Sequence, residues 1–111
     1  MKRTIGHGAA MLAAGFMLLM AGTAFAGDTK AVTINNFAFE PAHLVVAPGT
    51  TVVWTNQDEE PHTVTGASKD MSFKSAGLDT DETFSFVFGK PGTYKYFCSI
   101  HPHMVGEIIV K

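Results

Sequence analysis

The stretch YKYFCSIHPHMVGEIIV, residues 94–110, combines two alternating apolar runs with a cluster of metal-binding side chains. Successive side chains of a strand point to opposite faces, so Tyr94, Tyr96 and Cys98 would share one face. The closing residues of the stretch alternate in the same way. The segment therefore predicts two strands joined by a loop, with Cys98 on the core side at the end of the first strand.

The rest of the chain after residue 27 shows the same strand pattern. Short runs rich in Val, Thr, Phe and Tyr are separated by turn signals. These runs are residues 31–37, 43–46, 51–56, 61–65, 82–88, 89–98 and 105–111. Residues 66–79 are the only long irregular stretch. Runs with one apolar face each predict an all-β protein, an antiparallel β-sandwich of seven or eight strands.

The N-terminal segment has the three parts of an export signal. Lys2 and Arg3 form a positive head, residues 9–20 are largely apolar, and small residues lead up to Ala26. Residues 1–26 are therefore predicted to be a signal peptide cleaved after Ala26, which places the protein in the periplasm. A retained membrane anchor is less favoured, because the run is short and rich in Ala and Gly.

The expected mature domain, residues 27–111, is a single unit of 85 residues. It contains six lysines, no arginine and ten acidic residues, for a net charge of −4. This balance leaves no basic face for nucleic acid, and we expect a monomer without a membrane anchor. Cys98 is the only cysteine, so no internal disulfide can form. A single cysteine in an exported protein is paired between chains, free, or chemically active.

Three potential metal ligands follow one another at three-residue steps in one loop. Taken alone, Cys98 is more often an inert small hydrophobe, Met104 is more often core filler, and His101 is more often a turn residue. Together they offer a thiolate, a thioether and an imidazole. One further histidine would complete the ligand set of a blue copper site. His103 is the alternative histidine within the loop.

The second histidine of such a site must come from elsewhere in the chain. His62 begins a run directly after a loop and is favoured, while His43 lies within another run and is the weaker candidate. Asp58, Glu59 and Glu60 precede His62. They either steer a basic partner or belong to a solvated loop, and the sequence leaves both interpretations open.

On these motifs the chain resembles the cupredoxins, the family of plastocyanin, pseudoazurin and amicyanin. Residues 94–110 match the aromatic strand, ligand loop and closing strand of that family, and VVWTNQDEEPHTV, residues 52–64, matches its upstream histidine segment. The short Cys-x2-His-x2-Met loop is most similar to that of amicyanin. The resemblance covers nearly all of residues 30–111 and implies a Greek-key sandwich with one copper ion per chain. The implied copper ligands are His62, Cys98, His101 and Met104.

Two positions depart from the amicyanin pattern. Thr63 occupies a position that is usually asparagine, whose contacts help to hold the copper loop. His103 occupies an aromatic position and adds an imidazole beside the predicted site. His101 remains the favoured ligand, because its spacing from Cys98 matches the family.

The resemblance implies a small periplasmic blue (type 1) copper protein, not an enzyme, that carries single electrons by Cu(I)/Cu(II) cycling. Its expected partner is a redox protein such as a c-type cytochrome or a periplasmic dehydrogenase. Ile100, Pro102 and Val105 are expected to form an apolar rim around His101. The alternative is a copper-trafficking or storage protein, although such sites tend to be richer in methionine than residues 27–111 are.

Overall fold

The structure is a computed structural model that describes residues 27–68 and 73–111; the predicted signal peptide lies outside the described residues. The described residues form eight strands. Their bounds are β1 Thr29–Asn35, β2 Ala38–Glu40, β3 His43–Val46, β4 Thr50–Asn56, β5 Thr65–Gly66, β6 Thr83–Phe88, β7 Gly92–Phe97 and β8 Val105–Val110. Over the same residues, the chain has no helix of the length and apolarity that a bilayer crossing requires.

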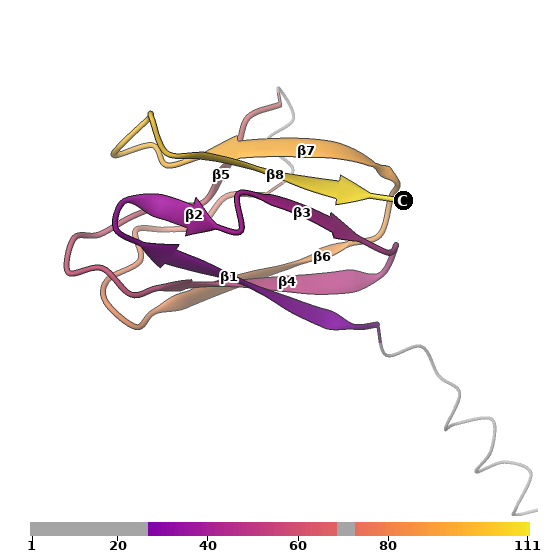
Figure 1. Ribbon diagram of the computed structural model, residues 1–111, viewed down its shortest axis with the longest axis horizontal. Helices are drawn as coiled ribbons and strands as arrows, with labels where there is room; N and C mark the ends of the chain where they lie inside the picture. Colours follow the sequence, from indigo (N-terminus) through magenta and orange to yellow (C-terminus); the bar gives the residue numbers. More distant parts are fainter. Residues whose placement is uncertain (1–26, 69–72) are drawn as a thin grey trace, which may run out of the picture.

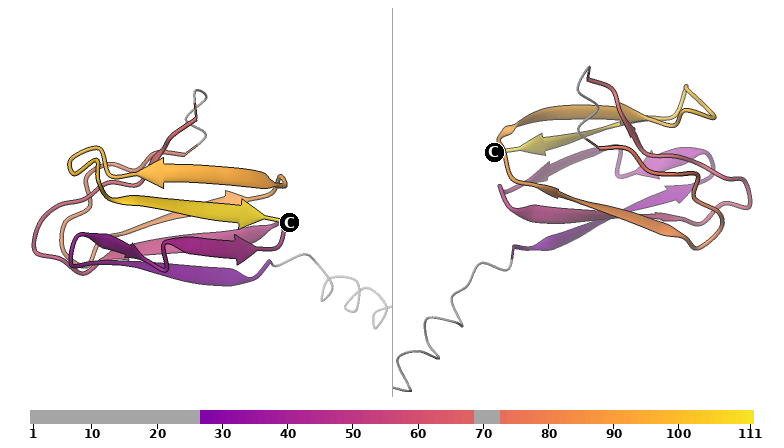
Figure 2. Two further views of the ribbon diagram at one scale, coloured as in Figure 1. Left: turned by 45° about the horizontal axis from the view of Figure 1, so that its top comes forward. Right: turned by 180° about the vertical axis from the view of Figure 1, so that it is seen from behind.

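The strands form two four-stranded sheets that pack face to face, as Figures 1 and 2 show. One sheet has the order β2-β1-β4-β6 and the other has the order β3-β8-β7-β5. This confirms the predicted β-sandwich, for which seven or eight strands were expected. The chain passes repeatedly from one sheet to the other, so strands that are distant in sequence become neighbours. Two neighbouring pairs, β1 with β4 and β3 with β8, run parallel, and both sheets are therefore mixed.

Aromatic rings fill the space between the sheets. Trp54 of β4 is fully buried, and its ring lies 5.4 Å from that of Tyr96 and 6.2 Å from that of Phe88, measured between centroids. The predicted alternation is confirmed in β7, where Tyr96 and the following Cys98 are both buried. Phe84 and Phe86 are half-buried and pack against this core.

Two local predictions differ from the structure. The run 31–37 was interpreted as one strand, but Asn36 and Phe37 have φ angles of 55° and 59° and reverse the chain into β2. The run 61–65 forms a strand only from Thr65; before it, His62 makes an isolated antiparallel bridge with Leu78. The N–H of His62 donates to the carbonyl of Leu78, and the N–H of Val64 donates to the Ser75 hydroxyl.

Three connections gather at one end of the sandwich. The β1–β2 turn, the β4–β5 connection and the β7–β8 loop lie at the end opposite the carboxyl terminus (Figure 1). All the metal-ligand candidates favoured by the sequence belong to the second and third of these connections. The fold therefore brings the two sequence motifs to the same pole.

Candidate metal centre

The β7–β8 loop is closed by its own backbone. The N–H of Met104 donates to the carbonyl of His101 over 2.9 Å, and the N–H of Cys98 donates to the carbonyl of Met104 over 3.1 Å. Cys98 is fully buried and Met104 is almost fully buried, while His101 is half-buried. The loop thus holds the thiol and the thioether at its base and the imidazole nearer the surface.

Three ligand atoms converge on one point. The Nδ1 atoms of His62 and His101 are 3.2 Å apart, and each lies 3.8 Å from the Sγ of Cys98. His62 and Cys98 have no exposed surface. The structure therefore brings together three of the four predicted site residues, and the fourth, Met104, lies buried in the same loop.

The spacing and chemistry of these atoms fit a single metal ion. Bonds of about 2.0 Å to nitrogen and about 2.3 Å to sulfur place neighbouring ligand atoms about 3–4 Å apart. The three measured separations lie within that range. Two imidazoles, a thiolate and a nearby thioether form the donor set that selects copper in electron-transfer sites.

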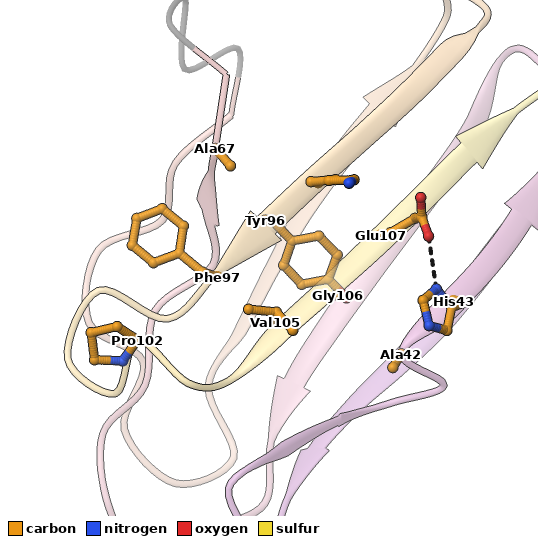
Figure 3. Close-up of a pocket in the computed structure, with 10 residues that line it drawn as sticks. Ala42, His43, Ala67, Tyr96, Phe97, Pro102, Val105, Gly106 and Glu107 are labelled. Carbon is orange, nitrogen blue, oxygen red and sulfur yellow. Dashed lines mark hydrogen bonds and ion pairs between the residues drawn. The ribbon is translucent and has the colours of Figure 1, made fainter.

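The other two histidines of the described chain lie outside this cluster. His103 is exposed in the loop and is not among the three converging residues. His43 of β3 pairs through Nδ1 with Glu107 of β8 over 2.8 Å. This pair lines a groove of about 620 Å³ on the outer face of the β3-β8-β7-β5 sheet. Figure 3 shows the pair on one side of the groove and Phe97 and Val105 on the opposite side. The preference for His62 over His43 agrees with this placement.

Thr63 fastens the two ligand segments to each other. Its N–H donates to the Sγ of Cys98 over 3.3 Å, and its Oγ1 accepts the N–H of Ser99 over 2.8 Å. The same Oγ1 lies 3.1 Å from the hydroxyl of Thr65 and 3.0 Å from that of Ser99. The threonine that departs from the amicyanin pattern therefore makes direct bonds to the loop.

Asp58 is a site residue whose contact with His62 the sequence analysis missed. The Nε2 of His62 lies 2.9 Å from its Oδ2, and the backbone N–H groups of Asn36 and Phe37 donate to its two oxygens over 2.6 and 2.9 Å. Burial opposes the charge, but the two N–H donors and His62 outweigh it and lower the pKa of Asp58. The four-residue step from Asp58 to His62 was the available signal, and two adjacent glutamates obscured it.

Phe37 is the second missed residue. Its ring meets His62 edge-on at 5.2 Å and His101 edge-on at 5.0 Å, between ring centroids. Phe37 is 47% exposed, so the site has a partly exposed aromatic residue in contact with both imidazoles. No sequence pattern near the ligands indicates this contact, because it comes from a turn at the far end of another hairpin.

Comparisons with known proteins identify relatives of the chain. Residues 8–110 match the cupredoxin-like domain family. Amicyanin-alpha of Methylorubrum extorquens is 35% identical over 89 residues, which cover 78% of this chain and 74% of that protein. A purple cupredoxin from Nitrosopumilus maritimus superposes with a TM-score of 0.69 at 33% identity, covering 74% of this chain and 99% of that chain. The Cu(I) form of an amicyanin mutant superposes with a TM-score of 0.72 at 30% identity, covering 79% and 87%.

Proposed function

The chain belongs to the cupredoxin-like family, and from this premise we propose that it is a blue copper protein that carries single electrons between redox partners. One observation supports the proposal above all others. Two imidazole nitrogens and one buried thiol converge within 3.8 Å, on a loop that also holds a buried methionine. Its relatives are cupredoxins, and we propose no enzymatic activity for this chain.

We assign His62, Cys98, His101 and Met104 as the ligands of one copper ion per chain. Copper, when bound, supplies a one-electron couple between Cu(I) and Cu(II). The thiol of Cys98 must lose its proton to bind, and the N–H of Thr63 stabilises the resulting thiolate. The backbone bonds inside the loop keep the ligand atoms in place, so little has to move when the charge of the site changes.

Electrons are proposed to enter and leave beside His101, the ligand nearest the surface. Exposed apolar side chains lie on the loop around it, and Ile100 and Val105 are 48% and 61% exposed. A small apolar surface of this kind suits brief docking of a second redox protein. A c-type cytochrome or a periplasmic dehydrogenase is the class of partner that we propose.

The proposed location is the periplasm. Residues 1–26 are proposed to direct export and to be removed after Ala26, leaving residues 27–111 as the functional domain. The support is the charged head, the apolar run and the small residues at the cleavage point. N-terminal sequencing of the exported protein tests this proposal, and a mature chain that retains Lys2 would contradict it.

Copper titration of the purified domain tests the ligand assignment. We expect one Cu(II) per chain and an intense visible absorption from charge transfer between the Cys98 thiolate and copper. Cys98→Ser should lose that absorption, because a hydroxyl is a poor soft ligand. His103→Ala is the matched control and should keep it, since His103 lies outside the cluster. A blue Cys98→Ser variant would contradict the assignment.

Electron exchange distinguishes the carrier from a trafficking protein. The reduced, copper-loaded protein is mixed with an oxidised c-type cytochrome and, separately, with a copper-free chelating acceptor. A carrier reduces the cytochrome and retains its copper. Rapid loss of copper to the acceptor, without reduction of the cytochrome, would favour trafficking instead.

A further inference from the structure

The carboxylate of Asp58 lies at the junction of the metal centre and the β1–β2 turn. It accepts hydrogen bonds from the Nε2–H of His62 and from two backbone N–H groups of the turn, so all three of its neighbours are donors. Its side chain is 11% exposed. Asn56, itself fully buried, accepts the backbone N–H of Asp58 through Oδ1 over 2.9 Å. Asn56 thus holds the backbone of Asp58, and three donors hold its carboxylate.

This contact determines which nitrogen of His62 carries the proton. A neutral imidazole has one N–H and one lone pair. The carboxylate can only accept a hydrogen bond, so the proton lies on Nε2 and the lone pair on Nδ1. That atom is the one that faces the thiol of Cys98 and the Nδ1 of His101. A carboxylate in this position orients a metal-binding histidine and raises its basicity.

The same carboxylate supports a turn that is unfavourable for its sequence. Asn36 and Phe37 both have positive φ, as in a two-residue type I′ hairpin. Glycine is usual at the second position, because a side chain such as phenylalanine rarely adopts that conformation. Asp58 accepts both N–H groups of the turn. This hairpin turn places the ring of Phe37 edge-on against His62 and His101.

We propose that Asp58 is a positioning residue of the metal centre, which fixes the tautomer of His62 and also holds the Phe37 ring against both imidazoles. The expected effect on copper binding rests on the proposed copper function, whereas the contacts of Asp58 with His62 and the turn do not. Asp58 does not bind the metal; it acts through His62 and Phe37. Glu59 and Glu60 differ from it in being exposed.

The substitution Asp58→Asn tests this role with little change in volume. An amide has one acceptor oxygen and would turn its NH₂ group toward at least one of the three donors. We expect Cu(II) affinity to fall about 10- to 100-fold, and the reduction potential to rise, because a less basic His62 stabilises Cu(II) less. Glu59→Gln removes the same charge from the adjacent exposed residue and should leave both quantities unchanged. Equal effects of the two substitutions would overturn the proposal.

A measurement on the metal-free protein separates this proposal from the copper function. Nitrogen NMR of the histidine side chains identifies which ring nitrogen of His62 carries the proton. Wild type should show an Nε2 proton that exchanges slowly with solvent, and Asp58→Asn should lose that preference. An Nδ1 proton in wild type would overturn the proposal, even if Asp58→Asn failed to fold. Failure of wild type to bind copper would instead refute the proposed function.

Phe37→Gly isolates the contribution of the ring. Glycine suits the positive φ of that position, so the variant should fold with little loss of stability. Copper release to a chelator should nevertheless become about three- to tenfold faster, as expected from the loss of aromatic contacts. Release at the wild-type rate would show that the ring has no part in holding the site.

Discussion

At the scale of single residues, Thr63 shows how one short side chain can join two distant segments. Its hydroxyl and its N–H contact Ser99 and Cys98, which lie 36 and 35 residues further along the chain. A threonine side chain is shorter than asparagine and has a single polar atom. It reaches the loop here because its own backbone N–H serves the thiol, which leaves the hydroxyl for Ser99.

Tyr96 presents a different case, a buried hydroxyl without a partner. Neither its oxygen nor the Nε1 of the adjacent Trp54 makes a hydrogen bond of good geometry with the described residues. Burial raises the pKa of Tyr96 to about 12, and the neighbouring indole offsets part of the effect. Tyr96→Phe removes the unpaired hydroxyl and keeps the ring. We therefore expect its free energy of unfolding at pH 7 to equal or exceed that of wild type.

The same substitution should change the alkaline limit of stability. The folded protein holds the Tyr96 proton more tightly than the unfolded chain, whose tyrosines titrate near 10. The contribution of the Tyr96 proton to the free energy of unfolding is thus fully present below pH 10. It is lost as the pH rises toward 12, by about 1.4 kcal/mol per pH unit. Urea unfolding at several pH values should show a shallower decline in Tyr96→Phe.

Tyr94→Phe is the matched control for this experiment. Its hydroxyl donates to the carbonyl of Lys90 over 2.6 Å, so its removal should cost about 0.5–1.5 kcal/mol at pH 7. The alkaline decline should persist, because Tyr96 is still present. A loss of more than about 1 kcal/mol at pH 7 in Tyr96→Phe would show that its hydroxyl has a partner after all.

The residues of the centre differ in how readily a sequence reveals them. Cys98 and His101 share one loop at fixed spacing, and His62 follows a turn at the start of a strand run, so all three were predicted and the structure brings them together. Asp58 and Phe37 were missed. The four-residue step from Asp58 to His62 is visible in the sequence. The contacts of both residues with the β1–β2 turn and the imidazoles depend on where that turn lies in space, which local spacing does not record.

At the scale of elements, the β7–β8 hairpin contains a close packing contact that fixes its shape. Gly106 of β8 lies directly opposite Tyr96 of β7, and a Cβ at Gly106 would overlap the tyrosine ring. That ring is confined by Phe39 and Trp54, at 4.7 and 5.4 Å between centroids. Glycine is therefore needed here for space and not for a left-handed backbone, since the φ of Gly106 is not positive.

Gly106→Ala should destabilise the protein by about 1–3 kcal/mol, because the core must shift to accommodate one methyl group. Chemical denaturation of the metal-free domain measures this effect. Gly89→Ala is the matched control, since a Cβ there meets open space. Similar losses in the two variants would show that backbone freedom, rather than crowding against Tyr96, sets the requirement.

The alternation of apolar and polar residues predicted most of the strands but not how they pair. A strand buried on one face has the same period in a parallel and in an antiparallel pair, so the parallel β1–β4 and β3–β8 pairs left no trace in the sequence. β2 was missed because a hairpin turn occupied by Asn36 and Phe37 lacks the usual glycine. Most of the run 61–65 lies outside a strand because the N–H groups of Thr63 and Val64 bind a thiol and a hydroxyl, and His62 makes only an isolated bridge.

At the scale of the whole molecule, the proposed ligands come from two connections that lie far apart in the sequence, the β4–β5 connection and the β7–β8 loop. A metal ion bound to both would act as a cross-link in a domain with no disulfide. At free copper a thousandfold above its dissociation constant, the folded state should gain about 4 kcal/mol. Thermal melts of metal-free and copper-loaded protein measure this gain, and Cys98→Ser should show a much smaller one. Coincident melts of the wild type would mean that copper binds weakly or binds the unfolded chain as well.

The metal centre and the carboxyl terminus occupy opposite ends of the sandwich (Figure 1). Lys111, the last residue, is bonded through its N–H to the carbonyl of Val46, at the pole away from the ligand loop. A linker fused to Lys111 would therefore leave the His101 surface unobstructed. On an electrode or a bead, molecules attached in this way would all present the pole of the proposed metal centre to the solution.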